Sequence, residues 1–175
     1  MSEEATPDHS FFIDILQTLE RIEAPYMIIG AFAGIIYGIS RVTYDIDIVV
    51  NLRESHLNQL AANYPLPRYY ADPEMMRNSI RLGIIFNIID TERGEKAGLV
   101  PLSGSPYARG AFERRVRQLI EIPGQADFEV WISQSEDVIL GKLMAWQEGR
   151  SRKHETDIYE MMVFYYLGED PVQSA

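Results

Sequence analysis

The sequence predicts a single α/β domain, in which a short mixed β-sheet is flanked by helices and closed by two C-terminal helices. The chain has 175 residues, of which 46% are hydrophobic, so it is long and apolar enough to bury one core. Helix-period and strand-period segments alternate in the first third, and a hairpin pattern follows near the middle. No repeat or low-complexity tract interrupts this order. We therefore expect one domain over residues 1–175, with a core at about 10–132 and closing helices at about 135–168.

The first part of the chain reads as helix, strand, helix, strand and helix. Phe12, Leu19 and Ile22 recur at helical spacing, and Pro25 stops that helix before a short apolar strand. Gly30 closes the strand, and a helix of small residues follows it. The predicted segments are helix 10–23, strand 26–29, helix 31–39, strand 43–51 and helix 54–63.

The second part adds a helix, a hairpin, two further helices around a strand, and a last apolar helix. Asp72 with Pro73 caps and opens a helix, after a loop marked by two prolines. Gly94 suits the positive φ of a hairpin turn. Ser135, followed by two acids, is expected to be the N-cap of the first closing helix. The predicted segments are helix 73–81, strands 84–90 and 96–101, helix 106–118, strand 128–132, and helices 136–148 and 155–167.

The composition excludes several classes of site. The chain has no cysteine and three histidines, so disulfides and thiolate metal sites are excluded and carboxylates must carry any metal chemistry. No apolar run approaches the roughly 18–20 residues of a membrane span. The segment MSEEATPDHS lacks the basic region of a signal peptide, so a cytoplasmic location is expected.

The net charge of −10 argues against broad attraction to nucleic acid, but two basic clusters lie in this acidic chain. The clusters are Arg109, Arg114, Arg115 and Arg117, and then Arg150, Arg152, Lys153 and His154. Each cluster is either a local patch that meets a polyanion or an ordinary solvated helix surface. His154 is not expected to act as a general base in such a basic connector.

Two carboxylates stand side by side on the strand at 43–51. The period-2 geometry of a strand points Asp45, Asp47 and Val49 to one face, and Ile46 and Ile48 to the other. Like charges at this spacing repel one another. The arrangement is favourable if a hard divalent cation such as Mg²⁺ lies between them.

The order of these features resembles the nucleotidyltransferase superfamily of DNA polymerase β. In that family's motif a Gly-Gly or Gly-Ser pair opens a helix, and Asp-x-Asp follows on the next strand; Gly30-Ala31 and Asp45-Ile46-Asp47 match it here. The resemblance narrows to compact bacterial nucleotidyltransferases related to AbiE-type toxin components, and it covers most of the chain. It is carried by Arg41-Val42-Thr43-Tyr44-Asp45-Ile46-Asp47, Phe86-Asn87-Ile88-Ile89-Asp90, Pro106-Tyr107 with Phe112-Glu113-Arg114-Arg115, Ser135-Glu136-Asp137-Val138-Ile139-Leu140-Gly141-Lys142-Leu143, and an acid at Asp157.

The resemblance implies a nucleotidyltransferase fold and metal-dependent transfer of a nucleoside monophosphate from an NTP to a hydroxyl, with release of pyrophosphate. It implies Mg²⁺ or Mn²⁺ as cofactor, with Asp45 and Asp47 as metal ligands. The nucleotide would meet backbone N–H groups at Gly30 and Ala31. The other implied nucleotide contacts are Lys142 on the phosphates, Asp157 orienting that lysine, and Arg41 and Thr43 steering a phosphate or a carboxylate, unless these last two only cap the strand.

One position departs from the family pattern. The compact bacterial nucleotidyltransferases that the chain resembles carry Lys-x-Asp-Leu after the hairpin turn, and here Gly98 stands at the position of this third carboxylate. Glycine can neither bind a metal nor accept a proton. Three alternatives follow: an impaired relative, a variant that lacks its third acid, or recruitment of Asp90 as a weak substitute.

The acceptor and the biological role stay open at this point. A tRNA 3′ end or other RNA, a protein hydroxyl and a small molecule such as an antibiotic all fit, and the cluster at 109–117 slightly favours RNA or a toxin–antitoxin setting. The rival function is a non-catalytic member of the fold that binds a nucleotide or a partner, for example a cognate toxin or antitoxin. A sugar-nucleotide glycosyltransferase is disfavoured because the chain is short for separate donor and acceptor domains.

Overall fold

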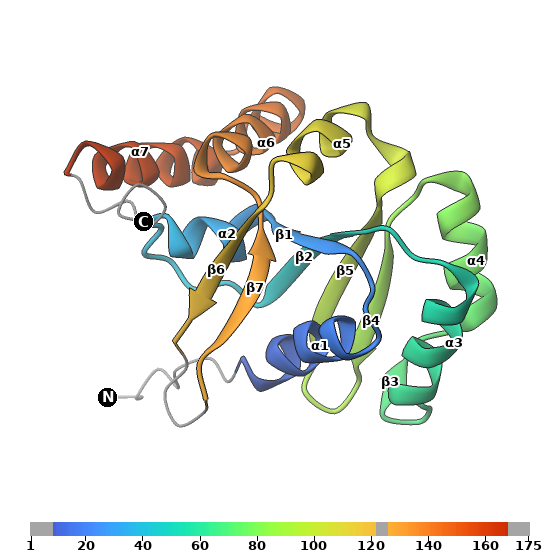
Figure 1. Ribbon diagram of the computed structural model, residues 1–175. Helices are drawn as coiled ribbons and strands as arrows, with labels where there is room; N and C mark the ends of the chain where they lie inside the picture. The colour runs from blue at the N-terminus through green and yellow to red at the C-terminus, as the bar shows by residue number, and fades with distance from the viewer. Residues whose placement is uncertain (1–8, 122–125, 168–175) are drawn as a thin grey trace.

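A mixed sheet forms the centre of the protein in the computed structural model, which describes residues 9–121 and 126–167 (Figure 1). The parts of the expected domain at 1–8, 122–125 and 168–175 lie outside the described residues. The strands are β1 (Tyr26–Ile29), β2 (Asp45–Val50), β3 (Tyr69–Tyr70), β4 (Phe86–Asp90), β5 (Glu95–Pro101), β6 (Val116–Ile120) and β7 (Phe128–Ile132). The helices are α1 (Ser10–Arg21), α2 (Gly30–Ile36), α3 (Glu54–Asn63), α4 (Pro73–Leu82), α5 (Pro106–Glu113), α6 (Ser135–Gly149) and α7 (Arg152–Tyr166), with a 3₁₀ turn at Leu102–Gly104.

The seven strands lie in the order β3-β4-β5-β2-β1-β7-β6. β2 runs parallel to β5 and β1 runs parallel to β7, whereas the other neighbours are antiparallel. The sheet is therefore mixed, as predicted, and β2 lies at its centre. The register across β2 pairs Asp45 with Lys96 and Asp47 with Gly98 on β5.

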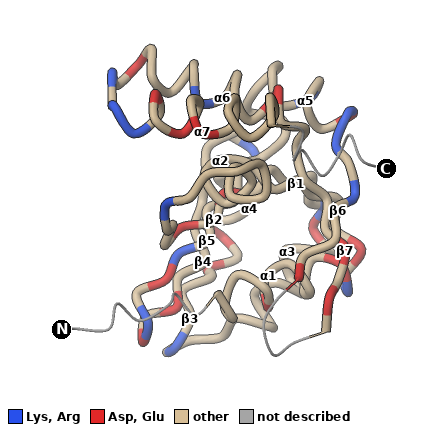
Figure 2. Tube along the Cα trace, turned by 90° about the vertical axis from the view of Figure 1, so that its left-hand side faces the viewer, with Lys and Arg blue, Asp and Glu red and all other residues tan. Residues whose placement is uncertain are grey.

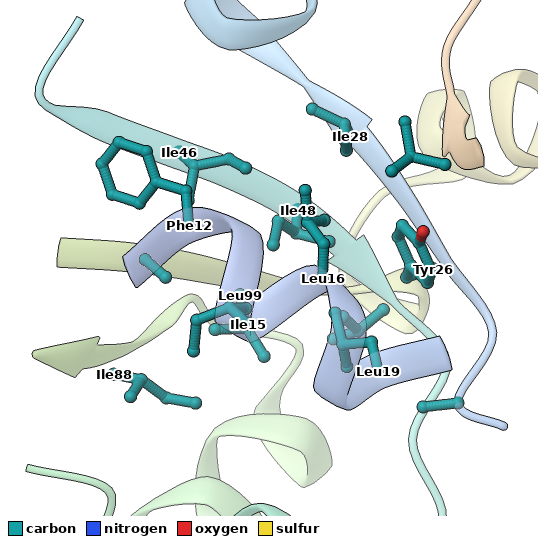
Figure 3. Packing of buried hydrophobic residues seen from close by; sticks show 14 of the residues in the cluster. Phe12, Ile15, Leu16, Leu19, Tyr26, Ile28, Ile46, Ile48, Ile88 and Leu99 are labelled. Atoms are coloured by element: carbon teal, nitrogen blue, oxygen red, sulfur yellow. The ribbon is translucent and has the colours of Figure 1, made fainter. Parts of the chain in front are cut away.

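The main core lies between one face of the sheet and α1. The apolar side of α1 is buried along its length because its hydrophobic residues recur every three or four positions. Figure 3 shows Phe12, Ile15 and Leu16 of α1 packed towards Ile46 and Ile48 of β2. All five side chains are at most 1% exposed. Each such side chain contributes about 1.5–3 kcal/mol when it leaves water.

A second, smaller apolar cluster lies on the other face of the sheet, under α5. It contains Met27 and Val49 from the strands and Ala108, Ala111 and Phe112 from the helix. The alternation predicted for the strand at 43–51 is thereby confirmed, since successive apolar side chains of β2 enter different cores. Because this cluster packs against the other end of β2, Asp45 stays exposed and Asp47 is only partly buried.

Helices α6 and α7 form an antiparallel pair beside α2 and α5 (Figure 1). Val138 of α6 and Met161 of α7 reach the main core. Tyr37, just after α2, donates a hydrogen bond from its hydroxyl to the carbonyl oxygen of Ser133 at 2.9 Å. The two predicted closing helices are confirmed, and the Tyr37 hydrogen bond joins the segment after β7 to the end of α2.

Three local predictions are wrong. The helix predicted over 106–118 ends at Glu113, and Val116 begins strand β6, which pairs residue by residue with β7. Ser135 is the first residue of α6 and Gln134 is its N-cap, without a side-chain capping bond. The short strand β3 falls in a region predicted as a loop, and it adds to the edge of the hairpin. The strands β3 and β6 were missed because each pairs with a strand further along the chain. The predicted N-cap of α6 is wrong by one residue.

None of the helices in the described ranges is long and apolar enough to span a membrane.

Candidate functional site

A cavity of about 560 Å³ opens on the face of the sheet that carries the acid pair. Its walls come from the ends of β1 and β2, the start of α2, and helices α5, α6 and α7. One end is polar and contains most of the residues predicted for the site. The other end is apolar and is lined by Met27, Val49, Val100, Ala108 and Ala111, which pack together in the smaller apolar cluster.

Strand β2 places both acids at the polar end of the cavity. Asp45 is exposed, and its Oδ1 lies 3.6 Å from Nζ of Lys96 on β5. Asp47 is half-buried, and burial, followed by the charge of Asp45, raises the pKa of its carboxyl group. The strand alternation therefore brings the two predicted ligands to one site, where their mutual repulsion is only partly offset by nearby lysines.

The turn at Gly30 is shaped around Asp47. Gly30 begins α2 with φ of +71°, a conformation that L side chains rarely adopt. A Cβ at this position would lie 3.0 Å from Oδ2 of Asp47. Gly30 and Ala31 both line the cavity that Asp45 and Asp47 also line.

Lys142, Asp157 and Arg41 form an ionic cluster beside the cavity, in which Lys142 and Asp157 are buried and the Arg41 side chain is 35% exposed. Nζ of Lys142 donates to Oδ2 of Asp157 at 2.6 Å, and the Arg41 guanidinium donates two hydrogen bonds to the same carboxylate, each at 2.8 Å. Asp157 is 0% exposed and the Lys142 side chain 5%. Burial alone would raise the pKa of the Asp157 carboxyl, but the bonds from Arg41 and Lys142 outweigh it and lower that pKa. Asp157 thus positions the two cations rather than facing the cavity itself.

Thr43 lies just before the acid pair and bonds to the backbone of Asp45. Its Oγ1 donates to the carbonyl oxygen of Asp45 at 3.0 Å and accepts from the Asp45 N–H at 3.4 Å. The side chain is buried and also lines the cavity. Its observed hydrogen bonds are with the backbone at Asp45, which favours the alternative that Thr43 caps the strand.

Gly98 lies directly against Asp47, at the position expected for the third acid. A Cβ there would be 2.8 Å from Oδ1 of Asp47, 3.1 Å from Cδ1 of Ile85 and 3.6 Å from Oδ1 of Asn87. The register predicted from the family motif is therefore consistent with the structure, and the missing side chain would have faced the acid pair.

Asp90 does not join this site. It is 0% exposed, its Oδ2 accepts from Nη2 of Arg68 at 3.0 Å, and its Oδ1 accepts from the N–H groups of Glu92 and Arg93. It shares its face of β4 with buried Phe86 and Ile88, whereas Asn87 shares the face of Gly98. The suggestion that Asp90 substitutes for the third carboxylate is therefore wrong, because its side chain lies on the other side of the sheet.

The two basic clusters from the sequence lie in different surroundings. In the first, Arg114 binds Asp137 at 2.7 Å, Arg117 binds Glu20 at 2.6 Å, and Arg115 stacks between two aromatic rings, while Arg109 is exposed. This cluster is mostly engaged within the chain, which weakens the reason to expect RNA. In the second, Lys153 and His154 line the cavity. The sequence shows this second cluster but not its place at the site, because the direction that the first turn of α7 faces depends on tertiary packing.

The acid pair fits a hard cation that arrives with phosphate oxygens. In the described part of the chain no group of three or more His, Cys, Asp or Glu side chains is placed to hold a metal ion. Mg²⁺ is commonly held by one or two carboxylates plus substrate phosphates, so two acids suffice for that mode of binding. When bound, such an ion would neutralise charge on the transferred phosphoryl group and lower the pKa of an acceptor hydroxyl.

Comparison with solved structures identifies the fold. The antibiotic-resistance factor ANT(2″)-Ia matches with a TM-score of 0.50 and 13% identity, over 94% of this chain and 92% of its own. The lincosamide antibiotic adenylyltransferase LnuA bound to lincomycin matches at 0.46 and 12%, over 90% and 98% of the two chains. JHP933 from Helicobacter pylori matches at 0.43 and 16%, over 82% and 57%. No protein-family model matches, and no curated protein gives a significant match.

The chain therefore has the fold of nucleotidyltransferases, as the sequence predicted. At these identities the comparisons show the fold, and the activity has to be argued from the residues of the cavity.

Replacing Gly30 by alanine tests whether the turn and the acid pair act together. We expect Gly30→Ala to lose about 1 kcal/mol of stability through its positive φ and, in addition, to displace Asp47 and weaken Mg²⁺-dependent NTP binding. The matched control is Gly94→Ala, because Gly94 has φ of +68° and open space around its Cβ position. Thermal melts should fall similarly for both variants. Equal NTP affinity in the two variants, measured by calorimetry with Mg²⁺, would contradict the coupling.

Proposed function

We propose that this protein is a metal-dependent nucleotidyltransferase that moves a nucleoside monophosphate from an NTP to a hydroxyl acceptor. The observation that carries the proposal is the cavity itself, which brings the Gly30 turn, Asp45, Asp47 and Lys142 to one place on this fold. Little covalent chemistry is required of the protein in phosphoryl transfer, because positioning and charge neutralisation supply most of the effect.

Each part of the site has a role in this reaction. The acid pair holds Mg²⁺ or Mn²⁺ together with the triphosphate, and the backbone at Gly30 and Ala31 approaches the phosphates. Lys142 supplies positive charge to the phosphates, with Asp157 and Arg41 fixing its position. The apolar end of the cavity provides a surface for a base or for part of the acceptor.

We propose a small molecule or a protein hydroxyl as the acceptor, in preference to RNA. The chain carries a net charge of −10, and most of the arginines that suggested an RNA site bind acids or rings within the chain. The structural neighbour with the TM-score of 0.50 is named as an antibiotic-resistance factor, so antibiotics belong in the first panel of acceptors to be tried.

The second candidate function is nucleotide or partner binding without transfer, for example in a toxin–antitoxin pair related to AbiE-type components. Gly98 is the observation that favours it, because no described carboxylate replaces the third acid beside Asp47. In this alternative the cavity would bind Mg²⁺ and NTP, and no pyrophosphate would be released.

Incubation with each α-labelled NTP and Mg²⁺ tests the proposal. Label is followed into total RNA, into protein and into a panel of hydroxyl-bearing antibiotics, and pyrophosphate release is measured in parallel. Transfer by the wild-type chain that disappears in Asp45→Asn and Asp47→Asn supports the proposal. Binding of an NTP without any transfer selects the second candidate, and transfer retained by both variants contradicts the role of the acids.

A further inference from the structure

The start of α7 concentrates positive charge on one wall of the cavity. Arg152, Lys153 and His154 occupy the first turn of this helix, and the latter two line the cavity. In Figure 2 the basic residues colour the connection between α6 and α7 blue. The N-terminus of a helix already carries partial positive charge, so cations there are unfavourable unless an anion lies nearby. Among the described residues, Lys153 forms no ion pair with an acid.

His154 provides a second observation that points to a ligand at this wall of the cavity. Its Nδ1 is buried and has no hydrogen-bond partner among the described residues. A buried polar atom left unsatisfied costs about 1–3 kcal/mol. The ring is therefore not held by a hydrogen bond from Nδ1 to the rest of the chain, although it lies in the wall of the cavity.

The charges around His154 come from three elements. Lys142 faces it from α6, Lys153 and Asp157 from α7, and Arg41 from the segment before β2. Burial is the largest cause, and it lowers the pKa of the His154 imidazole. Lys142 and Lys153 lower this pKa further, whereas Asp157 raises it. In the free protein these causes favour the neutral ring, which lies in the wall of a cavity that Lys142, Lys153 and Arg41 also line.

We propose that Lys153 and His154 bind the polyphosphate end of the nucleotide, and that His154 takes up a proton from water when the nucleotide binds. The inference rests on the proposed nucleotide site and adds two residues to it. A triphosphate brings several negative charges into the cluster of Lys142, Lys153 and His154. An opposite charge within about 4–6 Å favours the protonated ring, typically by one pH unit or more. Nucleotide affinity must then rise as pH falls, by linkage.

NMR titration of the histidine rings tests this directly, because the chain has only three histidines. Spectra are recorded from pH 5 to 8.5 without ligand and with ATP, CTP, GTP or UTP in excess Mg²⁺, which keeps the triphosphate ionised. The His154 signal, assigned with His154→Gln, is expected to move its midpoint upward by about one pH unit. His56 serves as the internal control, because it is 1% exposed and its ring bonds to Arg53.

The pH dependence of affinity gives an independent readout. The wild-type chain should bind the same NTP up to about tenfold more tightly at pH 6 than at pH 8, as a shift of one unit requires. His154→Gln should bind equally at both pH values, and Lys153→Gln should bind more weakly at both. NTP binding with an unmoved His154 midpoint overturns this inference alone. Absence of binding by all four NTPs overturns the inference and the proposed nucleotide site together.

Discussion

Asp157→Asn is expected to destabilise the protein by about 3–5 kcal/mol, the range for breaking a buried ion pair by removing one partner. The carboxylate is 0% exposed and accepts hydrogen bonds from both Lys142 and Arg41. Asparagine keeps the shape but leaves the ammonium of Lys142 buried without a counter-charge. Thermal melting at pH 7 should show a fall in Tm of roughly 6–20 °C. The matched control is Glu54→Gln, which breaks the exposed Arg77–Glu54 pair and should cost under about 1 kcal/mol.

A double variant separates the buried charge from general damage to α7. In the Asp157→Asn background, adding Lys142→Met should restore part of the lost stability, because it removes the uncompensated ammonium. In the wild-type background Lys142→Met should not stabilise the fold in this way. The pKa of Asp157 lies below its unfolded value, so its contribution is present above about pH 4 and is lost as pH falls through the folded value. A loss below 1 kcal/mol in the single variant at pH 7 would contradict the buried cluster.

Gly98→Asp is expected to raise nucleotidyl transfer by about a hundredfold or more, the lower end of what a positioned general base contributes. The new Cβ would lie 2.8 Å from Oδ1 of Asp47, so the added carboxylate faces the acid pair. The atoms it meets are the ends of the Asp47, Ile85 and Asn87 side chains, which can move. Gly98 does not have a positive φ, so the backbone accepts the side chain. The rate is measured by release of labelled pyrophosphate with Mg²⁺.

Gly98→Asn is the matched control for this gain, because it has the same size and no charge. We expect Gly98→Asn to stay at the wild-type rate. We also expect Gly98→Asp to be less stable than Gly98→Asn without Mg²⁺, since a third negative charge joins Asp45 and Asp47, and to gain more stability when Mg²⁺ is added. Equal transfer rates for the two variants would mean that the empty position at Gly98 does not limit the reaction.

The parts of the fold that were predicted correctly depend on local patterns. The alternation along β2 could be interpreted because Ile46 and Ile48 enter one core and Val49 enters another. The end of the helix at Glu113 could not be predicted, because β6 is stabilised by its antiparallel pairing with β7 rather than by its own sequence. A helix and a short amphipathic strand are hard to separate when the deciding contact is distant.

The site residues can be divided in the same way, into those placed by local spacing and those placed by distant contacts. Asp45, Asp47 and Gly30 lie close together in sequence, so their spacing sufficed to place them on one strand and one turn. The contact between Arg41 and Asp157 joins residues 116 positions apart, so no local pattern predicts that Asp157 holds Arg41 as well as Lys142. The places of Lys153 and His154 in the cavity wall depend on how α7 docks, which no local pattern specifies.

Calorimetric titration of the wild-type chain and Asp47→Asn with each NTP, with and without Mg²⁺, tests the central claim most directly. The account predicts that at least one NTP binds the wild type, that Mg²⁺ strengthens this binding, and that Asp47→Asn loses the Mg²⁺-dependent part by more than about a hundredfold while still folding. Binding that is the same in both chains and indifferent to Mg²⁺, or no binding of any NTP, would contradict it.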